Sequence, residues 1–335
     1  MTQTVTATRI GIDRYGDAGV LRRVDAPVGL PGAGEVRIRQ TAVGVNFVDI
    51  YFRTGAHPLP ALPALPDALG VEAAGVVDAV GPGVTDLVPG QRVAYAGLPT
   101  GSYASVRTLP AERVVPVPDG VSDDAAAAAL LKGITVYMLL HRVRQVGAGE
   151  TVLVHAAAGG VGLLATQWAR SLGARVIGTV GSAAKAALVR AQGADAVIDY
   201  READFVAAAR AFGGGAGVDY AIDGIGGDVL TRTLGAVRPF GMVASIGQVA
   251  AIGARHTIDL DELGPARSIA LARPSVLGFI ARDVAGYREA ARATLDRLAG
   301  GMHVEIGARL PLAQAADAHR LLESRKTTGA VVLVP

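Results

Sequence analysis

The chain contains no cysteine among its 335 residues. This absence excludes disulfide bonds, thiolate nucleophiles and every zinc site that uses cysteine ligands. An excess of one charge is also lacking, because 32 Lys and Arg residues are balanced by 30 Asp and Glu residues, for a net charge of +2. The sequence has no long basic block and no stripe of aromatic and basic residues, so nucleic-acid binding is not expected.

A secretion signal and a membrane span are also missing from the sequence pattern. Residues 1–16 lack the basic and then apolar layout of a signal peptide. Apolar runs are interrupted by Gly, His or charged residues before they reach the length of a span. The chain does have 44 glycines and 50% hydrophobic residues, which indicate a globular protein rich in turns. We therefore expect a cytoplasmic protein that is long enough for two domains.

The stretch from residue 151 to residue 180 predicts a strand, a glycine-rich turn, a helix and a second strand. Thr151–Val154 is a short β-branched run, residues 163–172 are apolar at helical spacing, and Ala174–Val180 is a second apolar run. A unit of this kind crosses over right-handed into a parallel sheet.

The turn Ala157–Gly162 is a variant of the dinucleotide-binding fingerprint G-x-G-x-x-G, with Ala157 in place of the first glycine. Gly159 would let the backbone approach a pyrophosphate, and Gly162 would let the helix pack close to the strand. The free N–H groups at the start of the helix would then face the phosphates. The alternative is an ordinary glycine-rich turn that binds no ligand.

The end of the second strand distinguishes between the two nicotinamide cofactors. An NAD-specific site needs a carboxylate there for the ribose 2′-hydroxyl, and the sequence Thr179–Ser182 has none. Ser182 at the cap of the next helix and Lys185 one turn later would suit a 2′-phosphate instead. We therefore predict NADPH, with a capping serine and a solvated lysine as the alternative explanation of these two residues.

The rest of the chain divides into a β-rich part, an alternating part and a tail. Twelve of the 17 prolines fall in the first 118 residues, among short strand candidates, and a helix begins at Ser122–Asp124. From there to about residue 247 strands and helices alternate, which predicts an α/β fold with a Rossmann-type doubly wound parallel sheet. The predicted strands lie at residues 35–40, 72–80, 92–95, 196–200, 218–222 and 241–246.

The last sixty residues leave the alternating pattern. They predict a helix over Tyr287–Leu298, a helix over Leu310–Leu322 begun by Pro311, and a terminal strand over Ala330–Val334. A closing strand after the nucleotide-binding part suggests that the tail returns to the β-rich part. We therefore expect one domain of residues 1–126 and 272–335, a second of residues 127–271, and a ligand in the cleft between them.

Six segments spread over nearly the whole chain carry a family resemblance: Val45–Tyr51, Gly70–Gly75, Leu131–Tyr137, Ala156–Gly162, Arg273–Ser275 and Leu322–Arg325. They resemble the medium-chain dehydrogenase/reductase superfamily and, within it, the zinc-free NADPH:quinone oxidoreductases related to zeta-crystallin. The resemblance implies that the β-rich part is a GroES-like catalytic domain and that the alternating part is a Rossmann NADP-binding domain.

The resemblance also implies that no metal takes part. Zinc-dependent relatives carry Cys where this chain has Asn46, and His where it has Val71. Asparagine and valine cannot supply thiolate and imidazole ligands. The four-cysteine zinc lobe of those relatives is missing after Val93, and the six histidines show no ligand spacing.

The cofactor contacts implied by the resemblance come from several segments. Gly224 is a departure from the family pattern, because relatives often have Ser at this position. This chain therefore lacks a side-chain hydrogen bond there, while backbone contacts remain available. The contacts are Phe47 and Tyr137 near the nicotinamide, Gly159, Gly160 and Val161 at the pyrophosphate, Ser182, Lys185 and Tyr200 at the 2′-phosphate, and Gly224, Gly247, Gln248 and Arg325 elsewhere on the nucleotide.

The candidate catalytic residues are Asn46, Asp49 and Tyr51. Asn46 and Asp49 lie one helical turn apart, and Asn46 could donate a hydrogen bond to a carbonyl oxygen. Tyr51 could donate a hydrogen bond or stack on a ring. The alternatives are a helix-start acid or structural ion pair for Asp49 and plain packing for Tyr51.

Three functions are compatible with these residues. The first is hydride transfer from NADPH to a quinone, which needs no metal because the negative charge develops on oxygen. The second is NADPH-dependent reduction of the C=C bond of a 2-alkenal or enone, which also needs a proton donor. The third is a structural or RNA-binding protein that binds NADPH with little turnover. The apolar stretch Ser268–Ile280 further suggests a homodimer formed through a sheet edge, or a strand buried within one chain.

Overall fold

The computed structural model describes residues 4–56, 65, 67–250 and 252–335. The chain forms two compact units, unit 1 with residues 1–134 and 277–335 and unit 2 with residues 135–276. The division into domains at 126/127 and 271/272 stays a prediction, because compactness does not test whether each part folds alone.

Unit 2 is built on a six-stranded parallel sheet with the order β11-β10-β9-β12-β13-β14. The strand order reverses between β9 and β12, as in a doubly wound dinucleotide-binding sheet. This sheet confirms the predicted α/β fold. The strands are β9 (Thr151–Val154), β10 (Arg175–Val180), β11 (Ala196–Asp199), β12 (Val218–Asp223), β13 (Val237–Ser245) and β14 (Ala270–Ala272).

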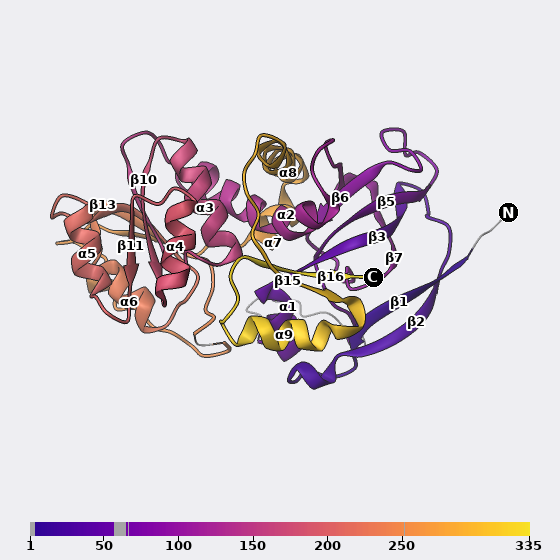
Figure 1. Cartoon of the computed structure of the whole chain (residues 1–335), viewed down its shortest axis with the longest axis horizontal. Coiled ribbons are helices and arrows are strands. Elements are labelled where there is room, and N and C mark those ends of the chain that lie inside the picture. Colours follow the sequence, from indigo (N-terminus) through magenta and orange to yellow (C-terminus); the bar gives the residue numbers. More distant parts are fainter. Residues whose placement is uncertain (1–3, 57–64, 66, 251) are drawn as a thin grey trace. The chain divides into compact units, whose positions relative to one another are not determined.

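Helices cover both faces of this sheet. In Figure 1, α3 (Gly160–Ser171) and α4 (Ala183–Ala191) lie on one side of the strands, and α5 (Phe205–Phe212) and α6 (Asp228–Leu234) lie on the other. Strands covered on both faces have few exposed positions, which is why they appear in the sequence as continuous apolar runs. The core between the sheet and α5 and α6 includes Leu153, Ile177, Phe205, Leu230 and Val243.

Unit 1 contains two sheets. The larger has the order β15-β16-β3-β5-β6-β8 with β7 also paired to β3, and the smaller has the order β2-β1-β4. The predicted terminal strand is confirmed, because β16 pairs antiparallel with β3. The strands are β1 (Val5–Ile12), β2 (Arg22–Val28), β3 (Glu35–Val45), β4 (Asp67–Ala68), β5 (Glu72–Val80), β6 (Arg92–Ala96), β7 (Val106–Pro110), β8 (Val114–Pro116), β15 (Ile306–Pro311) and β16 (Ala330–Val334).

The helices of unit 1 come from both ends of its chain. They are α1 (Phe47–Thr54), most of α2 (Asp123–Tyr137), most of α7 (Val276–Arg282), α8 (Val284–Ala299) and α9 (Ala315–Glu323). The start of α2 at Ser122 is confirmed, because the Ser122 hydroxyl accepts a hydrogen bond from the Ala125 N–H at 3.1 Å.

The structure refines the expectation for two apolar segments. The helix α2 continues into a π-helical segment, η3 (Met138–Val143), and Asp123–Val143 is long and apolar enough to span a membrane, although 83% of its apolar window is buried inside the protein. It is therefore a helix of the protein core. In addition, only Ala270–Ala272 of the stretch 268–280 is a strand, because residues from Val276 onward form α7.

The helix predicted over 310–322 begins later than expected. Residues 306–311 form β15, Leu312–Gln314 form a 3₁₀ turn, and α9 starts only at Ala315. In β15 half-buried Ile306, Ala308 and Leu310 alternate with exposed residues, which is the period of a strand. Pro311 ends this strand, where its missing N–H costs least, and does not open the helix.

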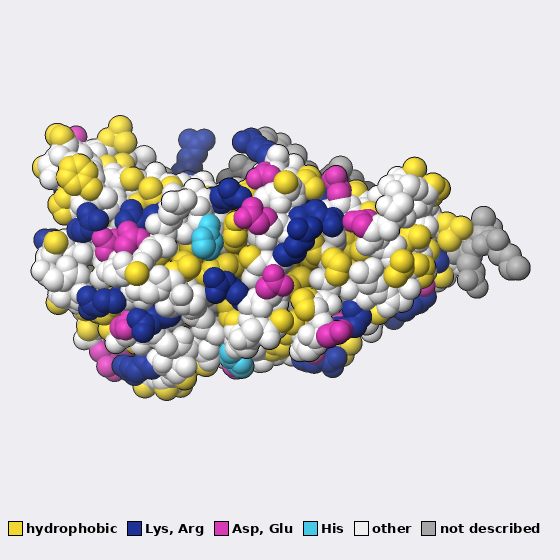
Figure 2. Space-filling view, turned by 90° about the horizontal axis from the view of Figure 1, so that it is seen from above, with side chains coloured by type: hydrophobic (Ala, Val, Ile, Leu, Met, Phe, Trp, Pro, Cys, Tyr) yellow, Lys and Arg dark blue, Asp and Glu magenta, His cyan; other side chains and the backbone are white. Residues whose placement is uncertain are grey.

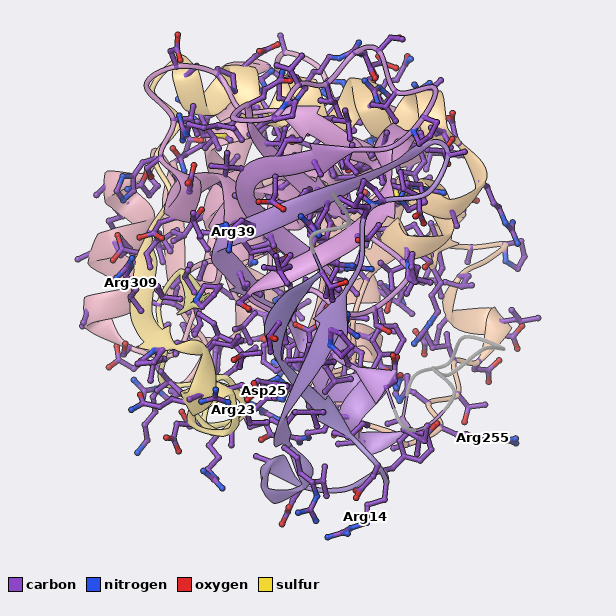
Figure 3. All side chains as sticks on the ribbon, turned by 90° about the vertical axis from the view of Figure 1, so that its right-hand side faces the viewer. Arg14, Arg23, Asp25, Arg39, Arg255 and Arg309 are labelled. Carbon is purple, nitrogen blue, oxygen red and sulfur yellow. The ribbon has the colours of Figure 1, made fainter. Side chains whose placement is uncertain are left out.

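Charged side chains on the described surface are mixed in sign. On the face drawn in Figure 2, basic and acidic side chains stand next to each other. Figure 3 labels exposed arginines of unit 1, of which Arg23 pairs with Asp25 at 3.3 Å and Arg309 pairs with Asp124 at 2.8 Å. Surface pairs of this kind contribute little to stability, about 0–1 kcal/mol each.

Candidate cofactor and acceptor sites

The glycine-rich turn of unit 2 joins β9 to α3. Gly159 is the N-cap of α3, with extended backbone angles, and its N–H donates to the Ala156 carbonyl at 2.9 Å. The first N–H groups of α3, from Gly160 and Val161 onward, have no carbonyl partner within the helix. Together with the helix dipole they form a site that suits an anion such as a pyrophosphate.

The glycines of this turn differ in the space around them. A Cβ atom on Gly162 would lie 2.6 Å from the Ala156 carbonyl oxygen and 2.7 Å from the Ala157 Cα, so only glycine fits there. The predicted packing role of Gly162 is therefore confirmed. A Cβ on Gly159 would lie 3.2 Å from its nearest neighbour, the Ala156 carbonyl oxygen. The predicted role of Gly159, close approach to a pyrophosphate, stays a prediction.

The three residues predicted for a 2′-phosphate lie at the ends of β10 and β11. Ser182 is the N-cap of α4, and its hydroxyl accepts a hydrogen bond from the Lys185 N–H at 3.3 Å. The Tyr200 hydroxyl lies against Gly181, where a Cβ atom would be only 2.5 Å from it. Ser182, Lys185 and Tyr200 are therefore brought together, while their role in binding stays a prediction.

Arg201 is a basic residue at this place that the sequence analysis missed. Partial burial lowers the pKa of Lys185, and the positive charge of Arg201 lowers this pKa further. Arg201 also pairs with Asp199 at 3.4 Å. Two cations close enough to repel each other are stabilised by an anion bound between them. The signal in the sequence was the position of Arg201 directly after the third strand of the sheet.

Two further predicted contacts follow the ends of β12 and β13. The register pairs Asp223 with Ser245, which places Gly224 beside Gly247. A Cβ on Gly247 would lie 2.7 Å from the Gly224 carbonyl oxygen, whereas a Cβ on Gly224 would meet its nearest neighbour only at 3.8 Å. Gly224 thus faces open space at the same edge of the sheet as the glycine-rich turn, where ligands of such sheets bind.

Asp223 and Arg273 support the two loops at this edge, and neither was predicted as a site residue. The buried Asp223 carboxylate accepts hydrogen bonds from the N–H groups of Ile225 at 2.9 Å and Gly226 at 3.1 Å. Burial raises the pKa of Asp223. Arg273 donates to the Gln248 side-chain oxygen at 3.0 Å, which holds the predicted contact Gln248 in place.

Tyr137 closes the last turn of α2 in unit 2. Its buried ring lies 4.8 Å from the His141 ring and 6.2 Å from the Trp168 ring, measured between centroids. The Arg142 guanidinium lies 5.8 Å from the same ring. These contacts fix Tyr137 against α3, and its contact with a nicotinamide stays a prediction.

In unit 1 the candidate catalytic residues lie at the start of α1. Asn46 is the N-cap of α1, and the Asp49 carboxylate accepts a hydrogen bond from the Asn46 N–H at 2.8 Å. Asp49 therefore has the contact of a helix-start acid. Phe47 and Tyr51 are half-buried on the same helix. Arg325, the predicted contact from the C-terminal segment, is exposed directly after α9 with a left-handed φ of 58°.

A chain of directed hydrogen bonds ends at Asp49. Arg53 lies 3.3 Å from His319 Nδ1 and can only donate, so His319 carries its proton on Nε2, which faces the Tyr103 hydroxyl at 2.9 Å. That hydroxyl in turn donates to Asp49 Oδ2 at 3.0 Å. Burial lowers the pKa of His319 to about 3, so the ring is neutral. His319 and Tyr103 lie far from Asp49 in the chain, so these hydrogen bonds could not be predicted from the sequence.

Burial also raises the pKa of Asp49 to about 7, and Glu72 adds to this rise, while the hydrogen bonds from Asn46 and Tyr103 and the charge of Lys132 oppose it. Because this pKa lies above the value of 3.8 for a free carboxyl, the protonated form stabilises the fold. This contribution is complete below about pH 4 and is lost as the pH rises to about 7. The Asp49 Oδ1 atom is buried and has no partner among the described residues.

Asp49→Asn should therefore flatten the pH dependence of stability. We expect the wild-type free energy of unfolding to fall between about pH 5 and pH 7, by up to about 1.4 kcal/mol per pH unit more than that of the variant. Urea unfolding at several pH values measures this difference. Asp119→Asn, at an exposed turn, is the control, and parallel profiles for wild type and Asp49→Asn would contradict the assignment.

Zinc does not fit the residues near Asn46. The side chains that meet there are the Asn46 amide, the Glu72 carboxylate and the Lys132 ammonium, with Lys132 Nζ 2.8 Å from Asn46 Oδ1 and 3.1 Å from Glu72 Oε2. An ammonium group repels a metal cation and supplies no lone pair to it. Within the described ranges no group of three or more His, Cys, Asp or Glu could hold a metal.

The strand order of unit 2, with a glycine-rich turn beside the point where the order reverses, defines a dinucleotide-binding fold. The sequence matches the alcohol dehydrogenase GroES-like domain over residues 32–119 and the zinc-binding dehydrogenase family over residues 160–299. The name of the second family refers to zinc, but the matched residues 160–299 do not include Asn46, and zinc does not fit the residues near Asn46.

Similar proteins cover the chain from end to end. Quinone oxidoreductase 1 of Escherichia coli is 39% identical over 332 residues, which are 98% of this chain and 100% of the relative. A 2-haloacrylate reductase of a Burkholderia species is 41% identical over 315 residues, 93% of this chain and 94% of the relative. The crystal structure of Escherichia coli quinone oxidoreductase complexed with NADPH has a TM-score of 0.91 at 39% identity, and covers 98% of this chain and 100% of that one.

The chain belongs to the quinone oxidoreductase family of the medium-chain dehydrogenases/reductases. The family resemblance stated from the sequence is therefore confirmed.

Proposed function

We propose that the protein is an NADPH-dependent quinone oxidoreductase that transfers hydride to quinones without a metal. The observation that carries this proposal is the end-to-end similarity to quinone oxidoreductase 1 of Escherichia coli, at 39% identity. A structure of that enzyme is complexed with NADPH. The pair of cations Lys185 and Arg201 supports the same cofactor here.

The residues of unit 2 fit the nucleotide part of NADPH. The N–H groups of Gly160 and Val161 bind the pyrophosphate, and Gly159 leaves room for it. Lys185 and Arg201 bind the 2′-phosphate with their charges, and Ser182 and Tyr200 add hydroxyl groups. Gly224, Gly247 and Gln248 contact the nucleotide at the ends of β12 and β13, as the family resemblance implies. When bound, NADPH supplies a hydride from C4 of its nicotinamide.

The residues of unit 1 act on the acceptor. Asn46 donates an Nδ2–H to the acceptor oxygen, on which negative charge develops during reduction. Asp49 holds the start of α1 through the Asn46 N–H. Tyr51 stacks on the acceptor ring or donates to it. Phe47 and Tyr137 are proposed as contacts of the nicotinamide, and Arg325 as a further contact of the cofactor.

Reduction of an activated C=C bond is the second candidate. The 41% identical relative from Burkholderia is named a 2-haloacrylate reductase, and that name is the observation that favours it. This reaction must also protonate the α-carbon, so a positioned acid such as Tyr51 would be needed. A quinone avoids this requirement because the hydroquinone oxygen can take its proton from water.

An acceptor panel at fixed NADPH tests the two functions. We expect kcat/KM for 1,4-benzoquinone to exceed that for a 2-alkenal or 2-haloacrylate by about tenfold or more, since oxygen is a better site than carbon for the developing charge. A preference for the alkenal would replace the first function by the second. Tight NADPH binding with no turnover of either acceptor would favour a structural role.

We also propose that the protein is a cytoplasmic homodimer. β14 is an edge strand of the parallel sheet, and an edge strand can pair with a second copy. Phe240, which is 78% exposed, donates its backbone N–H to the Ser268 carbonyl just before β14, so an apolar side chain lies near this edge. Gel filtration at micromolar concentration tests the proposal, and a monomer there would remove it.

A further inference from the structure

Lys132 carries a buried positive charge on α2, in a segment that the sequence analysis used only as a family marker. The residue is 7% exposed. Its Nζ donates to Asn46 Oδ1 at 2.8 Å and to Glu72 Oε2 at 3.1 Å. A charge taken out of water is retained only where partners compensate for the lost hydration. Lys132 is therefore a buried residue of unit 1 with two fixed hydrogen-bond partners, and not a solvated surface lysine.

Glu72 completes the cluster from β5. Its Oε2 also accepts a hydrogen bond from Asn46 Nδ2 at 2.8 Å, and its Oε1 accepts one from the Leu131 N–H at 2.6 Å. Gly44 on β3 leaves room for this carboxylate, because a Cβ atom there would collide with Glu72 Oε2 and with the Ala127 carbonyl oxygen. Side chains or backbone from β3, β5, α1 and α2 thus fix the three polar groups in one arrangement.

This arrangement settles which way the Asn46 amide points. An ammonium can only donate and a carboxylate can only accept, so Asn46 Oδ1 must face Lys132 and Nδ2 must face Glu72. Each amide nitrogen carries two hydrogens, and one remains after the bond to Glu72. Among the described residues, no partner is found for this second Nδ2–H or for the third hydrogen of Lys132 Nζ.

We propose that Lys132 is a positioning residue of the acceptor site: by holding Asn46 Oδ1, it aims the second Asn46 Nδ2–H at the oxygen of the bound quinone. This inference rests on the proposed quinone reductase function. Hydride transfer brings two electrons and one proton to the quinone and leaves a hydroquinone monoanion. The negative oxygen accepts the Asn46 hydrogen bond and then takes its second proton from water, which completes the hydroquinone.

The cation also acts on the strength of that hydrogen bond. A positive charge at Oδ1 withdraws electron density from the amide, which makes the Nδ2–H a better donor to a negative oxygen. Other charged or titratable groups near Asn46 are Glu72 from β5 and Asp49 from α1, with the Tyr103 hydroxyl next to Asp49. Lys132 is the cation in hydrogen-bond contact with the Asn46 side chain among the described residues.

A double-mutant cycle tests whether Lys132 acts through Asn46. Lys132→Met combined with Glu72→Gln removes both charges, so that no unpaired charge stays buried. We expect this variant to lower kcat for a weakly electrophilic acceptor, such as a methylated naphthoquinone, by about tenfold or more. KM for NADPH should change by less than about twofold, because the cofactor phosphates are bound by unit 2.

The same two substitutions in an Asn46→Ala background should cause almost no further loss of kcat. If the two losses of kcat multiply instead, Lys132 and Asn46 act independently and the inference is overturned. A rise of KM for NADPH that accompanies the loss of kcat would also overturn it. Lys326→Met, an exposed lysine in unit 1, is the control for the loss of a positive charge. If the Met/Gln variant does not give a cooperative thermal transition, Lys132→Gln combined with Glu72→Gln replaces it in the cycle. This pair also leaves no unpaired buried charge, and the loss of kcat is expected to be smaller because residue 132 keeps an N–H donor.

The outcome can be separated from failure of the proposed function. If wild-type protein binds NADPH but reduces no quinone, the proposed function fails before any variant is compared. If wild type reduces quinones and the cycle shows no coupling between Lys132 and Asn46, only the positioning role of Lys132 fails.

Discussion

Gly159→Val is expected to abolish binding of NADPH and of NADH while the protein stays folded. Gly159 has a φ of −81°, which any residue can adopt, and a Cβ there would meet its nearest neighbour at 3.2 Å. The fold can therefore accept the side chain with a small shift. The valine methyl groups would instead occupy the space in front of the α3 N–H groups, where a pyrophosphate would lie. Loss of affinity should exceed about a hundredfold, since phosphate contacts are blocked and not merely weakened.

Titration of NADPH fluorescence measures this affinity, and a thermal melt shows whether the variant is folded. Gly162→Val is the matched comparison, because a Cβ there would lie within 2.7 Å of backbone atoms of Ala156 and Ala157. Gly162→Val should lower the melting temperature as well as binding. Unchanged NADPH affinity in folded Gly159→Val would move the cofactor away from this turn.

The sequence was sufficient for features that depend on neighbouring residues. The strand, turn and helix around Gly159 lie within thirty residues, and their periodicity and glycines are local signals. The same holds for the cap Ser182 of α4. The parallel sheet followed from the alternation of such units, because a parallel pair needs a crossover helix.

The parts that were missed depend on residues far apart in the chain. Lys132 meets Glu72 and Asn46 only because α2 packs against β3 and β5, and no spacing rule links these three positions. Likewise Tyr103 and His319 are separated by 216 residues and become neighbours through the fold. The strand β15 was missed for a different reason, since Pro311 is as compatible with the end of an edge strand as with the start of a helix.

Lys185→Ala should raise KM for NADPH by about tenfold or more and leave KM for NADH nearly unchanged. Lys185 lies one turn into α4, behind the cap Ser182, and burial together with Arg201 lowers its pKa. The 2′-phosphate is the only part of NADPH that NADH lacks, so a charge-assisted bond to it affects one cofactor alone.

Arg201→Ala should act in the same direction, and Arg190→Ala, at an exposed position on the same helix, should leave both KM values unchanged. Steady-state kinetics with both cofactors at low and high salt measures these effects, and the wild-type preference for NADPH should shrink as salt screens the phosphate contacts. Equal loss of NADPH and NADH binding in Lys185→Ala would make Lys185 a structural residue and would remove the physical basis for NADPH selectivity at the end of β10.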